Sequence, residues 1–334
     1  MWITSSLDTV ETPTTVALGN FDGVHLGHRQ VIQPILRSAL AARDGRAVDS
    51  SDSVESLSYS TVVTFNPHPQ EFFTGQSREL LTPLDEKVQH LQHMGVQQLV
   101  LLPFNQDLAA LTPTNFVEHV LVQALGVQEI SVGQDFCFGC KRLGTSEDLK
   151  AIASQYGVTV HIVPLRTLKG DRISSSAIRQ ALQQGDVELA NRLLGRPYAL
   201  VGDVEYGQQV GRTLGFPTAN LRLPAEKFLP RFGVYAVSVI GAGLGGDRNI
   251  PGVMNIGYRP TVAGTQRTVE VHLLDWTGNL YGQTLTVNLK QFLRPEQKFA
   301  SLTELKAQIQ QDADNARSHL SVLRPTSTSM NANL

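Results

Sequence analysis

The sequence predicts an α/β fold followed by a second, antiparallel β domain, and three observations lead to this prediction. In the first half, short apolar runs alternate with helix-like stretches, which is typical of parallel β-α-β units in an open, doubly wound sheet. After Gly195-Arg196-Pro197 the chain is rich in glycine and its short runs alternate apolar with polar residues, as in a barrel or sandwich. A length of 334 residues is enough to bury two cores.

The expected strands of the first half are the apolar runs 15–18, 61–65, 99–103, 129–132 and 158–163. Thr82-Pro83 and Thr112-Pro113 each predict a helix that begins with an N-cap threonine and a proline at the first helical position. Residues 44–60 are polar and rich in serine, so we expect a flexible insertion between the first helix and the second strand.

The expected strands of the second half are the runs 198–204, 234–240, 268–273 and 284–289. Ser301 and Glu304 form a capping box that predicts a closing helix. The tail after Arg324 is expected to be disordered. The predicted domains are therefore 1–185 and 186–323, followed by the tail 324–334.

Composition excludes several classes of protein. A formal charge of −2 without a dense Lys/Arg block argues against a nucleic-acid surface. No apolar run approaches the roughly 20 residues needed to span a bilayer, and the N-terminus resembles no secretory signal. Cys137 and Cys140 form a C-x-x-C that could be a redox pair or half a zinc site, but an ordinary loop explains it as well. We expect a cytoplasmic protein with neither bound zinc nor a redox cofactor.

Two histidines and several glycines lie where the first strand should pass into the first helix, in L-G-N-F-D-G-V-H-L-G-H. His25 and His28, spaced i and i+3, would share one helix face. A helix N-terminus with nearby glycines suits a phosphate, and imidazoles there could bind its oxygens during transfer. A pair of surface histidines is the alternative, and a zinc pair is weaker because no third ligand is evident.

Two further stretches favour the phosphate interpretation. His68 lies between two prolines directly after a predicted strand, and the prolines stiffen its loop. Arg172-Ile-Ser-Ser-Ser-Ala-Ile-Arg179 opens another helix with hydroxyls and free N–H groups, so it could bind a second anion. Plain N-capping by the serines is the alternative.

The second half contains a glycine-rich run in which Gly207, Gly211 and Gly215 lie four residues apart. Such a flap could cover phosphates with backbone N–H groups. The chain after Pro217 should be extended, so Thr218 and Asn220 would project from one face and offer hard oxygen ligands to Mg²⁺. A glycine-rich barrel loop without a ligand is the alternative.

Four blocks of the first half, in order, are similar to the FMN adenylyltransferase module of bacterial bifunctional riboflavin kinase/FAD synthetases: G-N-F-D-G-V-H-L-G-H, T-F-N-P-H-P, V-G-Q-D-F-C-F-G and I-S-S-S-A-I-R. In the second half, G-R-T-L-G-F-P-T-A-N resembles the riboflavin kinase signature, supported by N-I-G-Y-R-P-T and V-E-V-H-L. The resemblance covers nearly the whole chain, except the insertion and the tail.

The resemblance implies a Rossmann-like nucleotidyltransferase domain followed by a Greek-key β-barrel kinase domain with a C-terminal helix. ATP would phosphorylate the 5′-hydroxyl of riboflavin, and the phosphate of FMN would then attack the α-phosphate of ATP to give FAD and pyrophosphate. The implied partners are riboflavin, FMN, FAD and ATP with Mg²⁺. Neither nucleic acid nor a membrane is expected, and the oligomeric state stays open.

The same resemblance assigns roles to individual residues. The implied catalytic residues are His25, His28, Arg179 and Glu270. Those expected to bind ATP or its phosphates are Gly19, Asn20, Phe21, Asp22, Gly23, Gly27, Ser174, Ser175, Ser176, Gly207, Gly211, Arg212 and Gly215. Thr218 and Asn220 would hold Mg²⁺–ATP. The flavin is expected near Phe65, Pro67, His68 and Asp135 in the first module and near Arg259 in the second.

Glu270 is the predicted base of the kinase. It alternates with Val269 and Val271, so it shares a strand face with Thr268 and His272. A charge in such a pattern usually lies on a solvated outer face. The V-E-V-H-L match favours instead the inner, ligand-facing side, where Glu270 would accept the hydroxyl proton. The rival functions are an enzyme with one active domain and a flavin-binding regulator without turnover.

Overall fold

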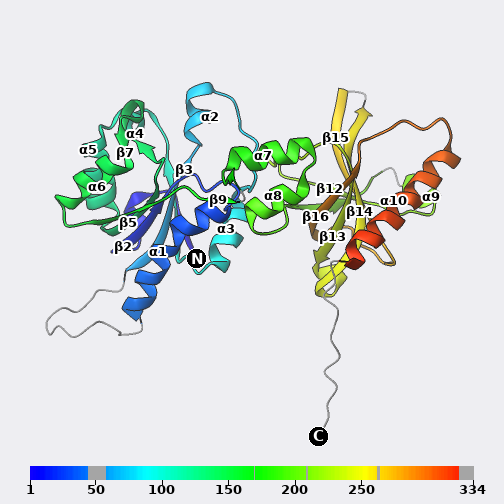
Figure 1. Cartoon of the computed structure of the whole chain (residues 1–334), viewed down its shortest axis with the longest axis horizontal. Helices are drawn as coiled ribbons and strands as arrows, with labels where there is room; N and C mark the ends of the chain where they lie inside the picture. Colours follow the sequence, from blue (N-terminus) through cyan, green and yellow to red (C-terminus); the bar gives the residue numbers. More distant parts are fainter. Residues whose placement is uncertain (44–57, 169, 208–209, 262–263, 323–334) are drawn as a thin grey trace, which may run out of the picture. The chain divides into compact units, whose positions relative to one another are not determined.

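The computed structural model describes residues 1–43, 58–168, 170–207, 210–261 and 264–322 of the chain. They form two compact units, residues 1–175 and 176–334, which are blue to green and green to red in Figure 1. The expected domain boundary after residue 185 stays a prediction. Most of the predicted insertion, 44–57, and the predicted tail lie outside the described residues.

The first unit is built on a six-stranded parallel sheet in the order β1-β4-β3-β2-β5-β8. Its strands are β1 (Trp2–Thr4), β2 (Thr14–Leu18), β3 (Tyr59–Asn66), β4 (Gln98–Pro103), β5 (Val127–Gly133) and β8 (Thr159–Val163). The predicted open parallel sheet is thereby confirmed, although β1 was not predicted. Tyr59 and Ser60, which we assigned to the insertion, begin β3, because they pair with β2.

Helices bury both faces of this sheet (Figure 1). They are α1 (Leu26–Arg43), α2 (Pro69–Thr74), α3 (Leu84–His93), α4 (Gln106–Ala110), α5 (Pro113–Asn115), a π-helix (Phe116–Ala124) and α6 (Ser146–Ser154). Val16 of β2 packs into one core together with Phe116, while Ala17 packs into a second core with Ile32 of α1. Successive strand residues therefore enter different cores, which explains why the predicted strands are continuous apolar runs.

Several short elements complete the first unit. They are β6 (Cys137–Phe138), β7 (Gly144–Thr145), β9 (Thr167–Leu168), β10 (Asp171–Arg172) and the 3₁₀ turns Leu7–Thr9 and Cys140–Arg142. Among the described residues of the chain, no helix is both long enough and apolar enough to cross a membrane.

The two Thr-Pro helix starts have different outcomes. Thr112 caps α5 as predicted, because its hydroxyl accepts a hydrogen bond from the backbone N–H of Asn115 at 3.2 Å, with Pro113 as the first helical residue. The prediction for Thr82 is wrong, because Pro83 is the N-cap of α3 and no side chain caps this helix. The hydroxyl of Thr82 is bound elsewhere, as described below.

The second unit is a closed antiparallel barrel in the order β11-β12-β15-β14-β13-β16. Its strands are β11 (Ala199–Glu205), β12 (Ala219–Arg222), β13 (Gly233–Gly241), β14 (Gly246–Thr261), β15 (Gly264–Leu273) and β16 (Thr284–Arg294). Its helices are α7 (Ser175–Gln184), α8 (Val187–Leu194), α9 (Val210–Thr213) and α10 (Leu302–Val322), with a 3₁₀ turn at Ala242–Leu244. The predicted barrel and closing helix are confirmed.

The closing helix packs on the outside of the barrel. Ala313 and Ala316 contact Ala236 and Leu274 in one buried cluster. Ser301 caps α10 by accepting a hydrogen bond from the N–H of Glu304, as the capping box predicted. Alanines on the contact face let the helix lie close to the strands.

Helices α7 and α8 also pack against the barrel. The amide of Asn191 donates to Leu289 O at 2.9 Å, and its oxygen accepts from the N–H of Tyr198 at 2.7 Å. The N–H of Arg231 donates to Leu182 O of α7 at 2.9 Å. By these contacts both helices are part of the second unit.

This packing predicts where the barrel can be separated from the first unit. A fragment of residues 186–323 lacks α7 and therefore loses the acceptor of the Arg231 N–H, whereas a fragment of residues 176–323 keeps it. One lost hydrogen bond costs about 1 kcal/mol, and the buried side chains of Ile178 and Leu182 are lost as well, so we expect the shorter fragment to unfold at least about 3–6 °C lower. Thermal unfolding of the two fragments checks this, and equal midpoints would show that the boundary lies after residue 185.

Candidate functional site

The loop between β2 and α1, residues 19–25, is irregular, and it is buried from Phe21 to His25, whereas Asn20 is exposed. Phe21, Asp22, Val24 and His25 are each less than a tenth exposed. Phe21 and Val24 have φ values of 48° and 39°, in the left-handed region that non-glycine residues rarely adopt. Such a backbone persists only where the surrounding structure determines it, and strained loops of this kind are frequent at ligand sites.

Side chains from other segments bind the carbonyl groups of loop 19–25. Asn20 O accepts hydrogen bonds from Thr64 Oγ1 at 3.1 Å and from Lys87 Nζ at 3.0 Å. Asp22 O accepts from Ser175 Oγ at 2.8 Å. The loop is therefore fixed by β3, α3 and the start of α7 together.

Thr82 binds the same loop, which explains why it does not cap α3. Its hydroxyl accepts a hydrogen bond from the N–H of Gly23 at 2.9 Å, and its own N–H donates to Asp22 Oδ1 at 3.2 Å. The sequence analysis gave Thr82 a helix-capping role, whereas the structure places it in contact with the predicted phosphate-binding loop.

His25 and His28 lie together at the start of α1. Their rings are stacked with centroids 3.6 Å apart, and the ring of Phe21 meets His28 edge-on at 5.2 Å. Nδ1 of His25 accepts a hydrogen bond from the N–H of His28 at 3.2 Å, so the proton of neutral His25 is on Nε2. His25 thus caps the helix while its Nε2–H can donate to an anion.

Two of the predicted glycines are favoured by close packing around these rings. A Cβ on Gly27 would lie 3.2 Å from the imidazole of His25, and a Cβ on Gly19 would lie 3.3 Å from the ring of Phe21. A side chain at residue 27 would therefore press on His25. These glycines allow the aromatic rings to lie directly on the backbone.

The residues of the second predicted anion site are divided between the two units. Ser174 and Ser175 belong to the first unit, where Ser175 binds loop 19–25. Ser176 and Arg179 belong to the second unit, in which the guanidinium of Arg179 lies 5.1 Å from the ring of Phe228. The segment does not follow the parallel strand β8 directly, because the hairpin β9–β10 lies between them.

His68 has a structural role in addition to the predicted flavin contact. It is the N-cap of α2, and its Nδ1 accepts a hydrogen bond from the N–H of Gln70 at 3.1 Å. Burial, followed by the charge of Arg78, lowers the pKa of His68 to about 4. Because the neutral form is favoured in the folded state, this contribution to stability is lost as the pH falls from about 6.5 towards 4. Pro67 precedes it in the same turn.

Asp135 is exposed, and its carboxylate forms an ion pair with Arg172 at 2.5 Å. Arg172 was not among the predicted binding residues. Both side chains are about half exposed, so the pair contributes little stability, but it joins the loop after β5 to the segment that leads into α7.

The sequence analysis missed an aromatic cluster around Phe65. Phe104 follows β4, and its ring meets Phe65 at 5.6 Å, Phe72 at 5.4 Å and Phe73 at 5.7 Å. Phe73 is 70 % exposed, although large apolar side chains are usually buried. The sequence signal was the pair Phe72-Phe73 on a short polar helix directly after the predicted His68 turn.

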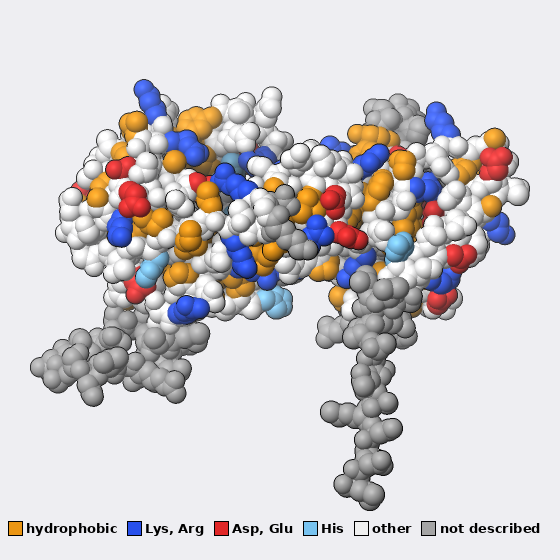
Figure 2. Space-filling model, viewed as in Figure 1, with side chains coloured by type: hydrophobic (Ala, Val, Ile, Leu, Met, Phe, Trp, Pro, Cys, Tyr) orange, Lys and Arg blue, Asp and Glu red, His pale blue; other side chains and the backbone are white. Residues whose placement is uncertain are grey.

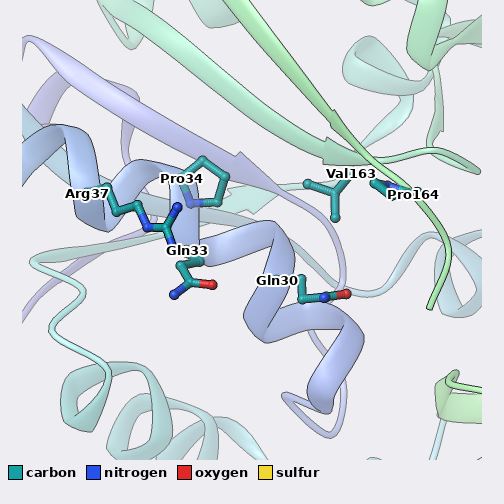
Figure 3. A pocket seen from close by; sticks show the side chains of 6 residues that line it. All are labelled: Gln30, Gln33, Pro34, Arg37, Val163 and Pro164. Carbon is teal, nitrogen blue, oxygen red and sulfur yellow. The ribbon is translucent and has the colours of Figure 1, made fainter. Parts of the chain in front are cut away.

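The two cysteines and the hollow beside α1 do not bring predicted site residues together. Cys137 and Cys140 are free, half-buried thiols. A hollow of about 230 Å³ lies between one face of α1 and the end of β8, lined by Gln30, Gln33, Pro34, Arg37, Val163 and Pro164 (Figure 3). On the face shown in Figure 2, Lys and Arg side chains are interspersed with Asp and Glu side chains.

The predicted residues of the second half form a polar row across three strands. Glu270 of β15 is paired with Asn220 of β12 on one side and with Asn255 of β14 on the other. Directly paired residues point to the same face of a sheet. Thr218 joins this row, because its hydroxyl donates to Glu270 Oε2 at 3.5 Å. The expectation that Thr218 and Asn220 share one face agrees with this geometry.

The expectation that Glu270 faces the inside of the barrel is wrong. Its neighbours Val269 and Val271 are buried, and Val271 pairs with Ala219 and Met254, which are also buried. The period of two therefore places Glu270 on the outer face. It is nevertheless half-buried there and in contact with Thr218, so it is not a freely solvated charge.

Two glycines of the glycine-rich run lie close to this row or to the residues that lead into it. A Cβ on Gly207 would overlap the amide of Asn220, and a Cβ on Gly211 would overlap Phe216 O. Gly215 has a φ of 91° and so requires glycine. Arg212 lies in α9 and is exposed, and the side chain of Arg259 is outside the described part of the structure.

Hydroxyl, amide and carboxylate oxygens come together in this row, and these are the ligands that Mg²⁺ accepts alongside phosphates and water. Among the described residues, no three His, Cys, Asp or Glu side chains gather as a metal cluster. A site for Mg²⁺ here would therefore depend on Thr218, Asn220 and the phosphates of a nucleotide.

Known proteins resemble both units. The family model described as FAD synthetase matches residues 7–177, and the model described as riboflavin kinase matches residues 194–320. The bifunctional riboflavin kinase/FMN adenylyltransferase of Escherichia coli K12 is 42 % identical over 93 % of this chain and 94 % of its own length. The protein of the same description from Bacillus subtilis is 37 % identical over 94 % of this chain and 95 % of its own length.

A solved structure is similar over both units. It is the crystal structure of a Streptococcus pneumoniae protein described as a macrolide-efflux protein, with 30 % identity and a TM-score of 0.80 over 94 % of this chain and 98 % of that chain. The two family models, in this order, and the relatives of nearly equal length agree with the motifs and with the two folds. The chain therefore belongs to the family of bifunctional riboflavin kinase/FMN adenylyltransferases.

Proposed function

We propose that the chain makes FAD from riboflavin in two ATP-dependent steps, at two separate sites. The observation that carries this proposal is the match of one family model to each unit, with a complete motif set in each. The barrel phosphorylates riboflavin to FMN, and the parallel-sheet unit adenylylates FMN to FAD. The efflux description of the pneumococcal protein has no counterpart in these sites.

In adenylyl transfer, a phosphate oxygen of FMN attacks the α-phosphorus of ATP, and the bond to the β-phosphate breaks to release pyrophosphate. Negative charge on the transferring group grows at the start of α1, where backbone N–H groups and the stacked His25 and His28 lie. We assign these imidazoles to the stabilisation of that charge. Ser174 of the same unit would bind the leaving phosphates, and the roles expected for Ser176 and Arg179 in this step stay predictions.

The flavin ring would lie near Phe65, where the aromatic cluster with Phe72, Phe73 and Phe104 offers exposed faces. An isoalloxazine is a large flat ring, and stacking on such faces supplies binding that hydrogen bonds alone do not. His68 follows β3 and Asp135 follows β5, the two strands that flank β2, and they could bind its polar edge.

In the kinase unit, the 5′-oxygen of riboflavin attacks the γ-phosphorus of ATP, ADP leaves, and the hydroxyl proton passes to Glu270. The carboxylate lies beside Thr218 and Asn220, so acceptor and nucleotide ligands are held in one row. Gly207, Gly211 and Gly215 allow the flap to approach the phosphates with its backbone. Arg259 would contact the flavin.

Thr218 and Asn220 would hold Mg²⁺ together with the nucleotide phosphates, since their oxygens are hard ligands on one face. When bound, the ion would neutralise phosphate charge. We expect both reactions to take place in the cytoplasm, without a nucleic-acid or membrane partner. The free thiols of Cys137 and Cys140 are assigned no metal or redox role.

The adenylyltransferase assignment predicts a selective defect. His28→Ala should lower the turnover of FMN to FAD by about 10²–10³-fold, because it removes a group that stabilises the transition state. Riboflavin phosphorylation by the same protein should be unchanged. Chromatography of the flavins measures both rates, and His93→Ala, an exposed histidine of α3, is the matched control. Equal loss of both activities in a folded His28→Ala protein would contradict two separate sites.

The kinase assignment predicts the opposite selectivity. Glu270→Gln should lower the kinase kcat by about 10²–10⁴-fold with a similar KM for ATP, because general-base help is lost while ground-state binding is kept. FAD formation from supplied FMN should be unaffected. Asp203→Asn is the control, since Asp203 is an exposed carboxylate of β11 that pairs with Arg222. Near-normal kinase turnover of Glu270→Gln would show that Glu270 is only a strand residue.

A further inference from the structure

Lys87 is a buried lysine under loop 19–25. It lies in the first turn of α3 and is 8 % exposed, although lysine side chains are almost never buried without a partner. Burial lowers the pKa of Lys87, and the nearby carboxylate of Asp22 opposes this shift. The surrounding fold therefore accepts a substantial desolvation cost at this position.

The ammonium of Lys87 binds a single backbone acceptor of the predicted phosphate-binding loop. Its Nζ donates to Asn20 O at 3.0 Å, and Thr64 Oγ1 donates to the same oxygen at 3.1 Å. Two donors from different elements, α3 and β3, thus meet at one carbonyl. A carbonyl oxygen has two lone pairs, so both bonds can form at once.

The held carbonyl is one residue away from Phe21, whose ring contacts His28, a residue assigned to catalysis. Phe21 follows Asn20, has a left-handed φ of 48°, and meets the ring of His28 at 5.2 Å. His28 in turn stacks on His25. A shift of the Asn20 peptide would therefore be passed through the Phe21 ring to the two imidazoles.

We propose that Lys87 is a positioning residue for adenylyl transfer, which holds the Asn20 carbonyl together with Thr64 and so fixes the stacked imidazoles of His25 and His28. This inference rests on the proposed assignment of adenylyl transfer to loop 19–25. In this proposal the ammonium of Lys87 stays on the Asn20 carbonyl, and its effect on the reaction is transmitted by the backbone of the loop.

The contribution of Lys87 to the reaction differs from a contribution to stability alone. Removal of one member of a buried polar pair usually lowers stability, but the Asn20 carbonyl keeps Thr64 Oγ1 as a donor when Lys87 is replaced. Methionine has nearly the length of lysine and removes the ammonium group, both donor and charge, while it keeps the apolar stem. A positioning role therefore predicts a loss of turnover for Lys87→Met in a protein that stays folded.

The test measures both reactions of the full-length chain carrying Lys87→Met. We expect the kcat of FMN adenylylation to fall about 10–100-fold, because a misplacement of about 1 Å costs up to about 10²-fold in rate. The KM for ATP should change less than kcat, and riboflavin phosphorylation should stay unchanged. Lys150→Met, an exposed lysine of α6, is the matched control and should leave both rates unchanged.

A double-mutant cycle with Thr64→Val tests the shared carbonyl. Thr64→Val alone should lower the adenylylation kcat about 2–10-fold, the range expected for one hydrogen bond. Once one donor is lost, the Asn20 carbonyl is no longer fixed, so removal of the second donor should have a smaller effect on kcat. The double variant should therefore lose less turnover than the product of the two single losses.

Three outcomes would overturn the inference. The first is a Lys87→Met protein whose adenylylation kcat is within about twofold of the parent, whatever its melting temperature. The second is a double variant whose loss of adenylylation kcat equals the product of the two single losses. If the Lys87→Met protein does not fold, the third outcome applies: an unchanged adenylylation kcat for Thr64→Val. The result for His28→Ala separates these outcomes from failure of the site assignment, because an active His28→Ala protein would remove loop 19–25 from the reaction altogether.

Discussion

Irregular backbone that is buried away from water must have its N–H and C=O groups paired, and this requirement governs loop 19–25. The loop begins after β2 and ends at His25, yet the groups that bind it come from β3, α3 and the start of α7. Its conformation is consequently a property of the whole first unit rather than of its own sequence. Left-handed residues such as Phe21 can persist there, and the stacked imidazoles inherit that fixed position.

A different constraint shapes the second unit. A closed barrel uses one side of every strand for its packed interior, so a half-buried ligand site must lie on the outer face or at an end. Val269 and Val271 enter the interior, and Glu270 between them is left outside with Asn220 and Asn255. Gly207 lies so close to Asn220 of this outer row that a Cβ would overlap its amide. The two candidate sites thus depend on unrelated structural solutions.

Local patterns in the sequence predicted the parallel sheet, an antiparallel barrel or sandwich, and a shared face for His25 and His28, because apolar period, helix starts and motif spacing are all local. Strand β14 was missed, since Pro251, Gly252 and Gly257 are typical of turns; there a Cβ on Gly252 would lie 2.9 Å from His272 O of the neighbouring strand. The Phe104 contacts and the role of Lys87 were also missed. Both depend on residues far apart in the chain that only the folded sheet brings together.

The central claim is that one chain transfers two different parts of ATP to one flavin. The most direct test incubates the full-length protein with riboflavin, Mg²⁺ and ATP labelled either at the α- or at the γ-phosphorus, followed by chromatography of the flavins. The account predicts that the γ-label enters FMN and is kept in FAD, whereas the α-label enters FAD alone. An α-label in FMN, or flavins that acquire neither label, would contradict it.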